Sequence, residues 1–471
     1  MIPTRASTAA TVGLALLVVG CAGPPVQPTG SPSASPTASV TPTASVAPTG
    51  PTPTPSATAS AEPTAATPSA TASAVPSPTA SAAPTPTPSA SPSPSPQAGW
   101  QLIADFPARS ATSVDAILAV GGGFVAIGSV FDDTAACFND ARHGRVWISA
   151  DGRAWTPAPD DTFAQAELQL LVEYGGALLV IGFVGSADPG SSCNPPAEPG
   201  FTTWRSTDGG ATWQRQGRAS GLDGARLTDV AVSELGLVAV GAQAPGEANQ
   251  AGVWISGDGL AWQPAGSAPT TENRLNAVAA RGNRVVAFAD CCDDPLAWIS
   301  RDGGRNWFEA SVTIPVVGPD DIAYPPTVGD IAVVANGFVA VGYACCLDPT
   351  PDQIPIVLTS TDGEDWPGEW LTVEHEEIST AVTVLPDGRL VAVGNGTYET
   401  GTRPPSDPSR FGGRSWISSV GTAWRAGPRF MELNEGQVSA VAAGPSGVVV
   451  AGTAAGPGGP RVWFAPLNSF D

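Results

Sequence analysis

One short apolar block recurs seven times in this chain, and this repetition restricts the folds open to it. The copies start 48 to 59 residues apart, are rich in Val, Leu and Ala, and end in Gly in six cases. Short apolar runs bounded by Gly predict strands that are buried on both faces. A repeat of this length predicts units that pack side by side as a solenoid, propeller or array. The copies are residues 124–128, 178–182, 237–241, 285–289, 338–342, 390–394 and 448–452.

A second motif follows most of these blocks at a variable distance. It reads Ser, any residue, Asp, Gly, and then Trp four or five residues after the Asp. The sixth copy has Val420 where the Asp is expected, and the seventh ends before its turn. The five complete copies contain Ser149, Asp151 and Trp155; Ser206, Asp208 and Trp213; Ser256, Asp258 and Trp262; Ser300, Asp302 and Trp307; and Ser360, Asp362 and Trp366.

These motifs resemble the Asp-box, or BNR repeat, of sialidase-like β-propellers. The resemblance covers residues 99–471 and implies that each motif closes a tight hairpin between the third and fourth strands of a blade. It implies that the Asp accepts hydrogen bonds from turn N–H groups, that Gly adopts positive φ, and that the Trp packs between blades. The five Asp residues are then turn fasteners rather than a catalytic or calcium-binding ring, and ligands bind on the opposite face.

The predicted fold is all-β: a seven-bladed β-propeller of four-stranded antiparallel blades, closed by the N-terminal strand. In the first blade we expect strands around residues 114–120, 124–128 and 145–149, and a fourth from residue 155. The seventh blade lacks a fourth strand before the chain ends. Trp100 stands in a setting like that of Trp262. We therefore expect residues 99–103 to pair with residues 461–465 and close the ring.

Three zones of composition divide the chain. Residues 1–21 are a short apolar segment that suits a signal peptide, because a membrane span needs about 20 apolar residues. Its end resembles the lipobox of bacterial lipoproteins, which implies that Cys21 is lipidated; an ordinary secretory signal is the alternative. Residues 22–98 are a linker rich in Pro, Ser, Thr and Ala, which is predicted to be disordered because it cannot form a core. Residues 99–471 form the propeller domain.

Charge excludes some partners. The chain has 21 basic residues, all Arg, against 43 acidic ones, for a net charge of −22. Such a chain repels phosphate backbones, so nucleic acid is excluded, and it does not dock on anionic lipid through charge. We expect a monomer that is exported, contacts the membrane only through the lipid on Cys21, and is displayed on the outer side of a bacterial membrane.

Six further cysteines fall in the predicted loops between the second and third strands of four blades. An even number in an exported protein predicts disulfides. Cys137 and Cys193 lie in adjacent blades and are the favoured pair, whereas the two doublets either cross-link or form vicinal bridges. A Cys-rich metal site is the alternative. The six are Cys137, Cys193, Cys291, Cys292, Cys345 and Cys346.

The same long loops are acidic, and they share one predicted face with the loops that connect successive blades. Loops on a rigid scaffold often carry function. The group contains Asp132, Asp133, Asp160, Asp161, Asp293, Asp294, Asp320, Asp321, Glu374, Glu376 and Glu377, with His143 and His375. A solvated rim that maintains solubility is one interpretation. A cation such as Ca²⁺ held by clustered carboxylates, or a cationic or carbohydrate ligand, are the others; no other cofactor is expected.

Two classes of function remain. One is a non-catalytic surface propeller that binds a protein, glycan or cell-envelope component through this loop face. The other is a glycoside hydrolase of sialidase-like or xyloglucanase-like type. The chain lacks the Arg-Ile-Pro motif of sialidases and has only 4 Tyr and 2 His. No catalytic residue is assigned, although the many carboxylates leave paired-acid hydrolysis open.

Lipidation of Cys21 is directly testable. We expect the Cys21→Ser variant to lose its partition with membranes, because the thiol is the predicted lipid acceptor. Fractionation of cells that express the two forms measures this. A variant that remains membrane-bound and is processed as before would contradict the prediction.

Overall fold

The computed structural model divides the chain into two units, residues 1–89 and residues 90–471. The signal segment, Cys21 and the linker lie outside the residues that it describes. In the described part of the chain, no helix is long and apolar enough to cross a membrane. The described residues all belong to the second unit: 99–103, 106, 111–131, 142–185, 196, 198–243, 250–271, 273–290, 296–315, 326–344, 353–371, 377–397, 411–430, 437–453 and 459–471.

The described residues form short strands and two 3₁₀ turns, η2 (Asp160–Phe163) and η5 (Leu467–Phe470). The first strands are β1 (Gln101–Leu102), β2 (Ala111–Val120), β3 (Gly123–Phe131), β4 (Arg142–Ser149), β5 (Thr156–Pro157), β6 (Ala166–Tyr174), β7 (Ala177–Val184), β8 (Gly200–Ser206), β9 (Gln214–Arg218), β10 (Ala225–Ser233), β11 (Gly236–Gln243), β12 (Gln250–Ser256) and β13 (Trp262–Pro264). The rest are β14 (Leu275–Arg281), β15 (Arg284–Ala289), β16 (Ala297–Ser300), β17 (Trp307–Thr313), β18 (Pro326–Val334), β19 (Gly337–Ala344), β20 (Ile354–Ser360), β21 (Asp365–Trp370), β22 (Glu377–Val384), β23 (Leu390–Thr397), β24 (Phe411–Ser418), β25 (Trp424–Ala426), β26 (Gln437–Gly444), β27 (Gly447–Thr453) and β28 (Pro460–Ala465).

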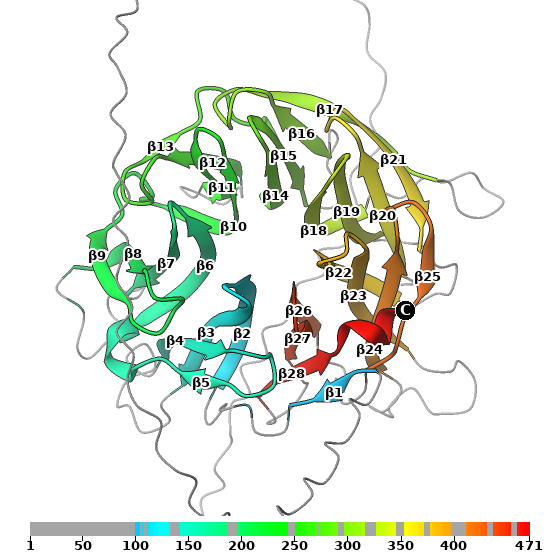
Figure 1. The fold of residues 1–471 in the computed structure, drawn as a ribbon. Helices are drawn as coiled ribbons and strands as arrows, with labels where there is room; N and C mark the ends of the chain where they lie inside the picture. The colour runs from blue at the N-terminus through cyan, green and yellow to red at the C-terminus, as the bar shows by residue number, and fades with distance from the viewer. Residues whose placement is uncertain are drawn as a thin grey trace, which may run out of the picture. The chain divides into compact units, whose positions relative to one another are not determined.

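These strands make six small sheets in a propeller-like arrangement. Five have four strands: β2–β5, β6–β9, β10–β13, β22–β25, and β26–β28 with β1. The sixth has eight strands, in which the antiparallel runs β14–β17 and β18–β21 are joined through β17 and β21. The innermost strands β2, β6, β10, β14, β18, β22 and β26 contact one another in a closed ring (Figure 1). The expected all-β, propeller-like arrangement is therefore present, but two expected blades share one sheet.

The core lies between neighbouring sheets, as the apolar blocks predict. In β11, Leu237 and Ala239 pack into the cluster shared with the β6–β9 sheet. Val238 and Val240 pack into the cluster shared with β14–β17. Because side chains alternate along a strand, one apolar run fills two different cores.

Parallel bridges between the outer strands explain the eight-stranded sheet. Ser220, which follows β9, bridges Ala261 before β13, and Ser267, which follows β13, bridges Asn306 before β17. At the next position, β17 and β21 pair in parallel over three residue pairs, from Ser311 with Asp365 to Thr313 with Pro367. The β17–β21 pairing is thus the longest of three successive parallel links between neighbouring outer strands, and it joins two four-stranded runs into one sheet.

The N-terminal strand completes the last sheet. Gln101 pairs with Phe464 and Leu102 with Trp463, so β1 is the outer neighbour of β28 (Figure 1). The expected pairing of this segment is therefore present. Trp100 Nε1 donates a 3.1 Å hydrogen bond to the Pro428 carbonyl, and its ring lies 5.2 Å from that of Phe430.

Deletion of the N-terminal strand should unfold the ring. We expect a chain lacking residues 1–98 to remain folded and one lacking residues 1–104 to be strongly destabilised. The longer deletion removes the pairing of β1 and the packing of Trp100, which together should cost about 3 kcal/mol or more. Thermal unfolding of the two truncated chains measures this, and equal midpoints would contradict closure by β1.

Candidate functional site

The Asp motifs form tight turns, all built in one way. In the first, Asp151 Oδ1 accepts hydrogen bonds from the N–H groups of Arg153 and Ala154 at 2.9 and 3.0 Å. Ser149 Oγ accepts the Gly152 N–H at 2.8 Å, and Gly152 has φ +79°. The two copies with a longer Asp-to-Trp spacing contain one additional Gly at positive φ, as in Gly209 and Gly210. The carboxylates of these turns therefore accept hydrogen bonds from the backbone N–H groups of their own turns.

The motif Trp residues also have a polar function that the sequence did not indicate. In six turns the indole Nε1–H donates to the carbonyl of the Gly three residues earlier, at 2.8 to 3.1 Å. Their rings pack on the preceding sheet; Trp366 lies 4.9 Å from the Phe288 ring. In the sixth turn, Gly421 still donates to Ser418 Oγ, whereas Val420 is 66% exposed and supplies no acceptor.

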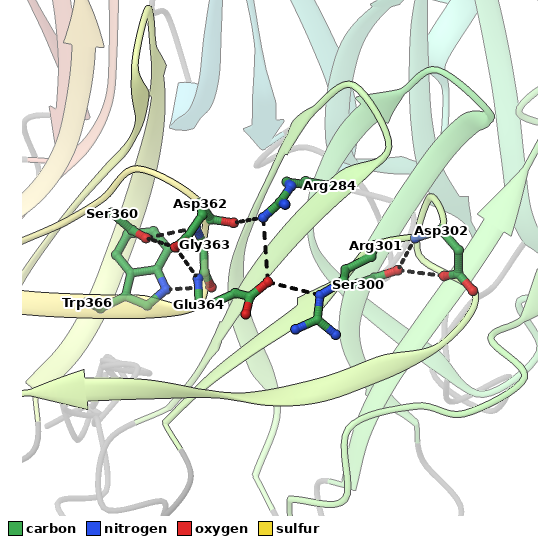
Figure 2. Close-up of polar contacts among 9 residues, drawn as sticks. All are labelled: Arg284, Ser300, Arg301, Asp302, Ser360, Asp362, Gly363, Glu364 and Trp366. Atoms are coloured by element: carbon green, nitrogen blue, oxygen red, sulfur yellow. Dashed lines mark hydrogen bonds and ion pairs between the residues drawn. The ribbon is translucent and has the colours of Figure 1, made fainter.

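One pair of neighbouring turns is also linked by charge. Figure 2 shows Glu364 between Arg301 and Arg284, where its Oε1 lies 3.0 Å from Arg301 Nε and 3.6 Å from Arg284 Nη1. Arg284 also donates a 2.7 Å hydrogen bond to the Asp362 carbonyl. These contacts support the turns beside the β17–β21 pairing. The charged side chains of these two turns are therefore engaged with one another and with the backbone.

Most of the predicted ligand-face residues lie outside the described residues. This holds for all six domain cysteines and for Asp132, Asp133, Asp293, Asp294, Asp320, Asp321, Glu374, His375 and Glu376. Asp160 and Asp161 begin η2. His143 lies in β4, where its Nδ1 accepts a hydrogen bond from the Gln165 N–H at 3.3 Å.

The prediction that Glu377 belongs to a solvated acidic rim is wrong. Glu377 is only 4% exposed, and its Oε1 lies 2.5 Å from Arg414 Nε, which is also buried. The pair spans from β22 to β24 above Gly396, where any side chain would collide with both partners. A carboxylate can be buried at this depth because the guanidinium compensates its charge.

A cavity of about 400 Å³ lies where the inner strands meet, and polar side chains from these strands line it. All seven inner strands contribute to its wall. Each has a register shift at the same level, which leaves one extra residue between two paired ones. The extra residues are Asp115, Gln169, Thr228, Asn276, Gly329, Thr380 and Ser439, and all line the cavity.

The glycine that ends six of the seven apolar blocks lies opposite the bulge of the neighbouring inner strand. At Gly128 an added Cβ would collide with the carbonyl oxygen of Ser113, just before the bulge in β2. Gly394 has the same relation to Ile378 before the bulge in β22. Because the inner strand comes this close to its neighbour, only a residue without a bulky side chain fits opposite the bulge.

Polar side chains at the bulges tie one sheet to the next. Thr228 Oγ1 donates to the Leu275 carbonyl at 2.6 Å, and Ser439 Oγ donates to the Val114 carbonyl at 2.7 Å. Each acceptor is the residue before the bulge in the next inner strand. The ring is therefore held at its centre by hydrogen bonds between sheets.

Two carboxylates also tie one sheet to the next, each with one oxygen, while the other oxygen accepts the N–H of the following residue. Asp229 accepts the N–H of Val230 at 2.7 Å and that of Val278 in the next sheet at 2.8 Å. Asp330 accepts the N–H of Ile331 at 2.7 Å and that of Val382 at 2.9 Å. Each oxygen keeps a second lone pair, so these groups can still accept a hydrogen bond from a ligand.

Burial raises the pKa of Asp229 to about 7 and that of Asp330 to about 6. The cause is loss of hydration of the charged form, which the backbone hydrogen bonds offset only in part; the charge of Asp330 adds to the effect on Asp229. Asp115 is the third acid of the wall, and no described lining residue is basic. The cavity can therefore exchange protons near neutral pH and presents acceptors to a ligand.

Sequence reasoning missed this site although a signal was present. Each inner strand has a polar or Gly residue at a nearly constant distance before the last residue of the apolar block. Asp229 and Asp330 follow that position directly. The repeated polar position could have indicated a ring of inward-facing groups.

No protein-family model and no curated protein matches the chain. Among solved structures, an α-L-arabinanase of Penicillium chrysogenum with arabinobiose is 17% identical over 67% of this chain and 97% of its own, with a TM-score of 0.41. A Trypanosoma rangeli sialidase is 14% identical over 67% of this chain and 54% of its own, with a TM-score of 0.37. An α-L-arabinofuranosidase of Fusarium graminearum is 13% identical, covers 64% and 94%, and has a TM-score of 0.38. These likenesses are too low to support any argument about this chain.

The raised pKa values predict that stability falls as the pH rises. The unfolded chain ionises its Asp residues near pH 4, so the folded form binds extra protons between about pH 4 and the pKa values of about 6 and 7. This contribution to stability is complete below about pH 4 and is lost through pH 6 to 7. We expect the thermal midpoint to fall from pH 5 to pH 8, and to fall less in the Asp229→Asn variant.

Asp208→Asn is the matched control for this measurement. Hydrogen bonds from the Thr212 side chain and backbone lower the pKa of Asp208 to about 2, so it is ionised throughout the range from pH 5 to 8. Its variant should show the same pH-dependent fall as the unmodified chain. An equally large fall in the Asp229→Asn chain would contradict the assignment.

Restoring the missing turn acceptor should stabilise the sixth turn. Val420→Asp places a carboxylate two residues after Ser418, with the spacing to Trp424 that Asp258 has to Trp262. We expect a gain of about 1 kcal/mol in the free energy of unfolding, and a comparable loss in the reciprocal variant Asp258→Val. Urea unfolding measures both, and a destabilised Val420→Asp chain would show that the sixth turn differs in backbone geometry.

Proposed function

We propose that the chain is a lipid-anchored surface protein whose seven-bladed propeller binds a cell-envelope ligand without turnover. The observation that carries the proposal is the central cavity, whose wall combines carboxylate, amide and hydroxyl groups from every inner strand. Cavities of 300 to about 1,000 Å³ with a few convergent polar groups are typical of ligand sites. The lipidated Cys21 and the linker of residues 22–98 would hold this domain away from the membrane.

The count of seven blades rests on treating the eight-stranded sheet as two. The runs β14–β17 and β18–β21 are each antiparallel, and they meet only through their outer strands. Two single bridges of the same kind link β6–β9 to β10–β13 and β10–β13 to β14–β17 without merging these sheets. Each of the seven inner strands also has its own bulge and its own apolar block, which supports one blade for each.

The chemistry of the wall favours neutral or cationic ligands. Recognition of a carboxylate such as that of sialic acid draws on guanidinium groups, and no described residue that lines the cavity is basic. The loops that carry Asp293, Asp294, Asp320 and Asp321 would extend the acidic surface. A structural Ca²⁺ in those loops, and disulfides between their cysteines, remain part of the proposal.

A glycoside hydrolase is the second candidate, because two carboxyl groups with raised pKa values line one cavity. At neutral pH an acid with a pKa of about 7 is partly protonated, whereas one with a pKa of about 6 is mostly ionised. A raised pKa suits a general acid, which glycoside hydrolysis pairs with a second carboxylate. Against this role, both oxygens of each group already hold backbone N–H groups.

A capture experiment with an activity screen separates the two functions. We expect the purified chain to retain a component of a cell-envelope extract and to hydrolyse no glycoside. Charge reversal at Asp293, Asp294, Asp320 and Asp321 should weaken capture with the thermal midpoint unchanged. The same reversal at the turn residues Asp151 and Asp258 should lower the midpoint instead. Glycan hydrolysis that is abolished by Asp330→Asn would establish the enzyme and overturn the binding function.

A further inference from the structure

The acids of the central cavity are distributed around its wall rather than gathered. Asp115 comes from β2, Asp229 from β10 and Asp330 from β18. One inner strand separates the first from the second and the second from the third, and two separate the third from the first. The intervening strands β6 and β14 contribute the amides Gln169 and Asn276. Hydroxyl groups of Thr380 and Ser439 complete the circle. A ligand in this cavity therefore meets separate negative positions with neutral acceptors between them.

One polar group of the wall lacks a partner in the described structure. The side-chain oxygen of Gln169 is fully buried and accepts no hydrogen bond from any described residue. A buried unpaired acceptor costs about 1–3 kcal/mol, and a ligand donor that reached Gln169 would remove this cost. This observation is independent of the acids, because Gln169 is uncharged and lies on a different inner strand.

A metal ion does not suit this arrangement. Ca²⁺ needs six to eight oxygens that converge at 2.3–2.6 Å, and the described residues contain no group of three or more acidic, His or Cys side chains placed to hold a metal. A molecule with spaced ammonium groups has the opposite requirement. Each ammonium has three N–H donors and no acceptor, which matches carboxylates and amide oxygens set apart from one another.

We propose that the central cavity binds a small aliphatic polyamine, with its ammonium groups donating to Asp229, Asp330 and the Gln169 amide. This inference rests on the proposed binding function and names the chemistry of its ligand. The volume of about 400 Å³ accommodates such a chain, and the wall offers no aromatic side chain to hold a methylated ammonium instead.

Binding should depend on pH in a defined direction. The charged groups that line the cavity are Asp115, Asp229 and Asp330. At pH 5.5 Asp229 and Asp330 are mainly protonated, given their pKa values of about 7 and 6, whereas at pH 8 both are ionised. Aliphatic amines keep their charge over this range. Affinity should therefore be higher at pH 8, and binding at pH 5.5 should release protons, because the ammonium groups favour the ionised carboxylates.

Calorimetric titration of the full chain with spermidine tests the proposal. At pH 8 and 150 mM salt we expect saturable binding with one site, at least about tenfold weaker at pH 5.5. Asp330→Asn should weaken binding about tenfold at pH 8. Gln169→Leu should also weaken it, and because the Gln169 side-chain oxygen has no partner among the described residues, this variant should not lower the thermal midpoint. Glu309→Gln removes an exposed charge on β17, outside the cavity wall, and should leave binding unchanged.

The possible outcomes separate this inference from the proposed function. Spermidine binding that survives in Gln169→Leu and Asp330→Asn would be general attraction to an acidic chain and would overturn the inference. Binding of Ca²⁺ that the same two substitutions abolish would replace the polyamine by a metal. Capture of an envelope component with no spermidine binding would leave the proposed function standing and reject only its ligand class. If Asp330→Asn fails to fold, Gln169→Leu alone decides.

Discussion

Every sheet of this protein has two apolar faces, and it can bury them only against two neighbours. A strand such as β11 sends Leu237 and Ala239 to one core and Val238 and Val240 to another. A sheet at an open end of the row would expose one of these faces and a strand edge as well. This requirement explains why the chain returns to its start, where β1 and Trp100 complete the sheet of β26–β28.

Closure brings seven strands together around one axis, where polar side chains form hydrogen bonds between neighbouring sheets. The bulges place one additional residue of each inner strand at the same level, and Thr228, Ser439, Asp229 and Asp330 use these positions to bond the next sheet. The groups that hold the ring together also line its cavity. A proton or ligand that changes the charge of Asp229 or Asp330 therefore acts on the bonds between sheets, which couples occupancy of the cavity to stability.

The two ends of the strands serve different purposes. At one end, the Ser, Asp, Gly and Trp turns are short, and their polar groups are used by backbone, with Glu364, Arg301 and Arg284 linking two of them. At the other end, the buried Glu377–Arg414 pair shows that a charge near the loops can be structural. Residue type alone therefore does not identify a ligand contact on that face.

The sequence by itself determined the repeat, the strands of each apolar block, the turns and the closing segment. These features follow from local chemistry: alternation of side chains along a strand, a carboxylate that accepts nearby N–H groups, and a glycine where φ is positive. It left open the surroundings of each acid, because burial and partners arise only after distant segments meet. Glu377 and Asp330 look equally exposed in a sequence. The fold gives one an Arg414 partner from two strands away, and sets the other in a poorly hydrated wall formed by all seven inner strands.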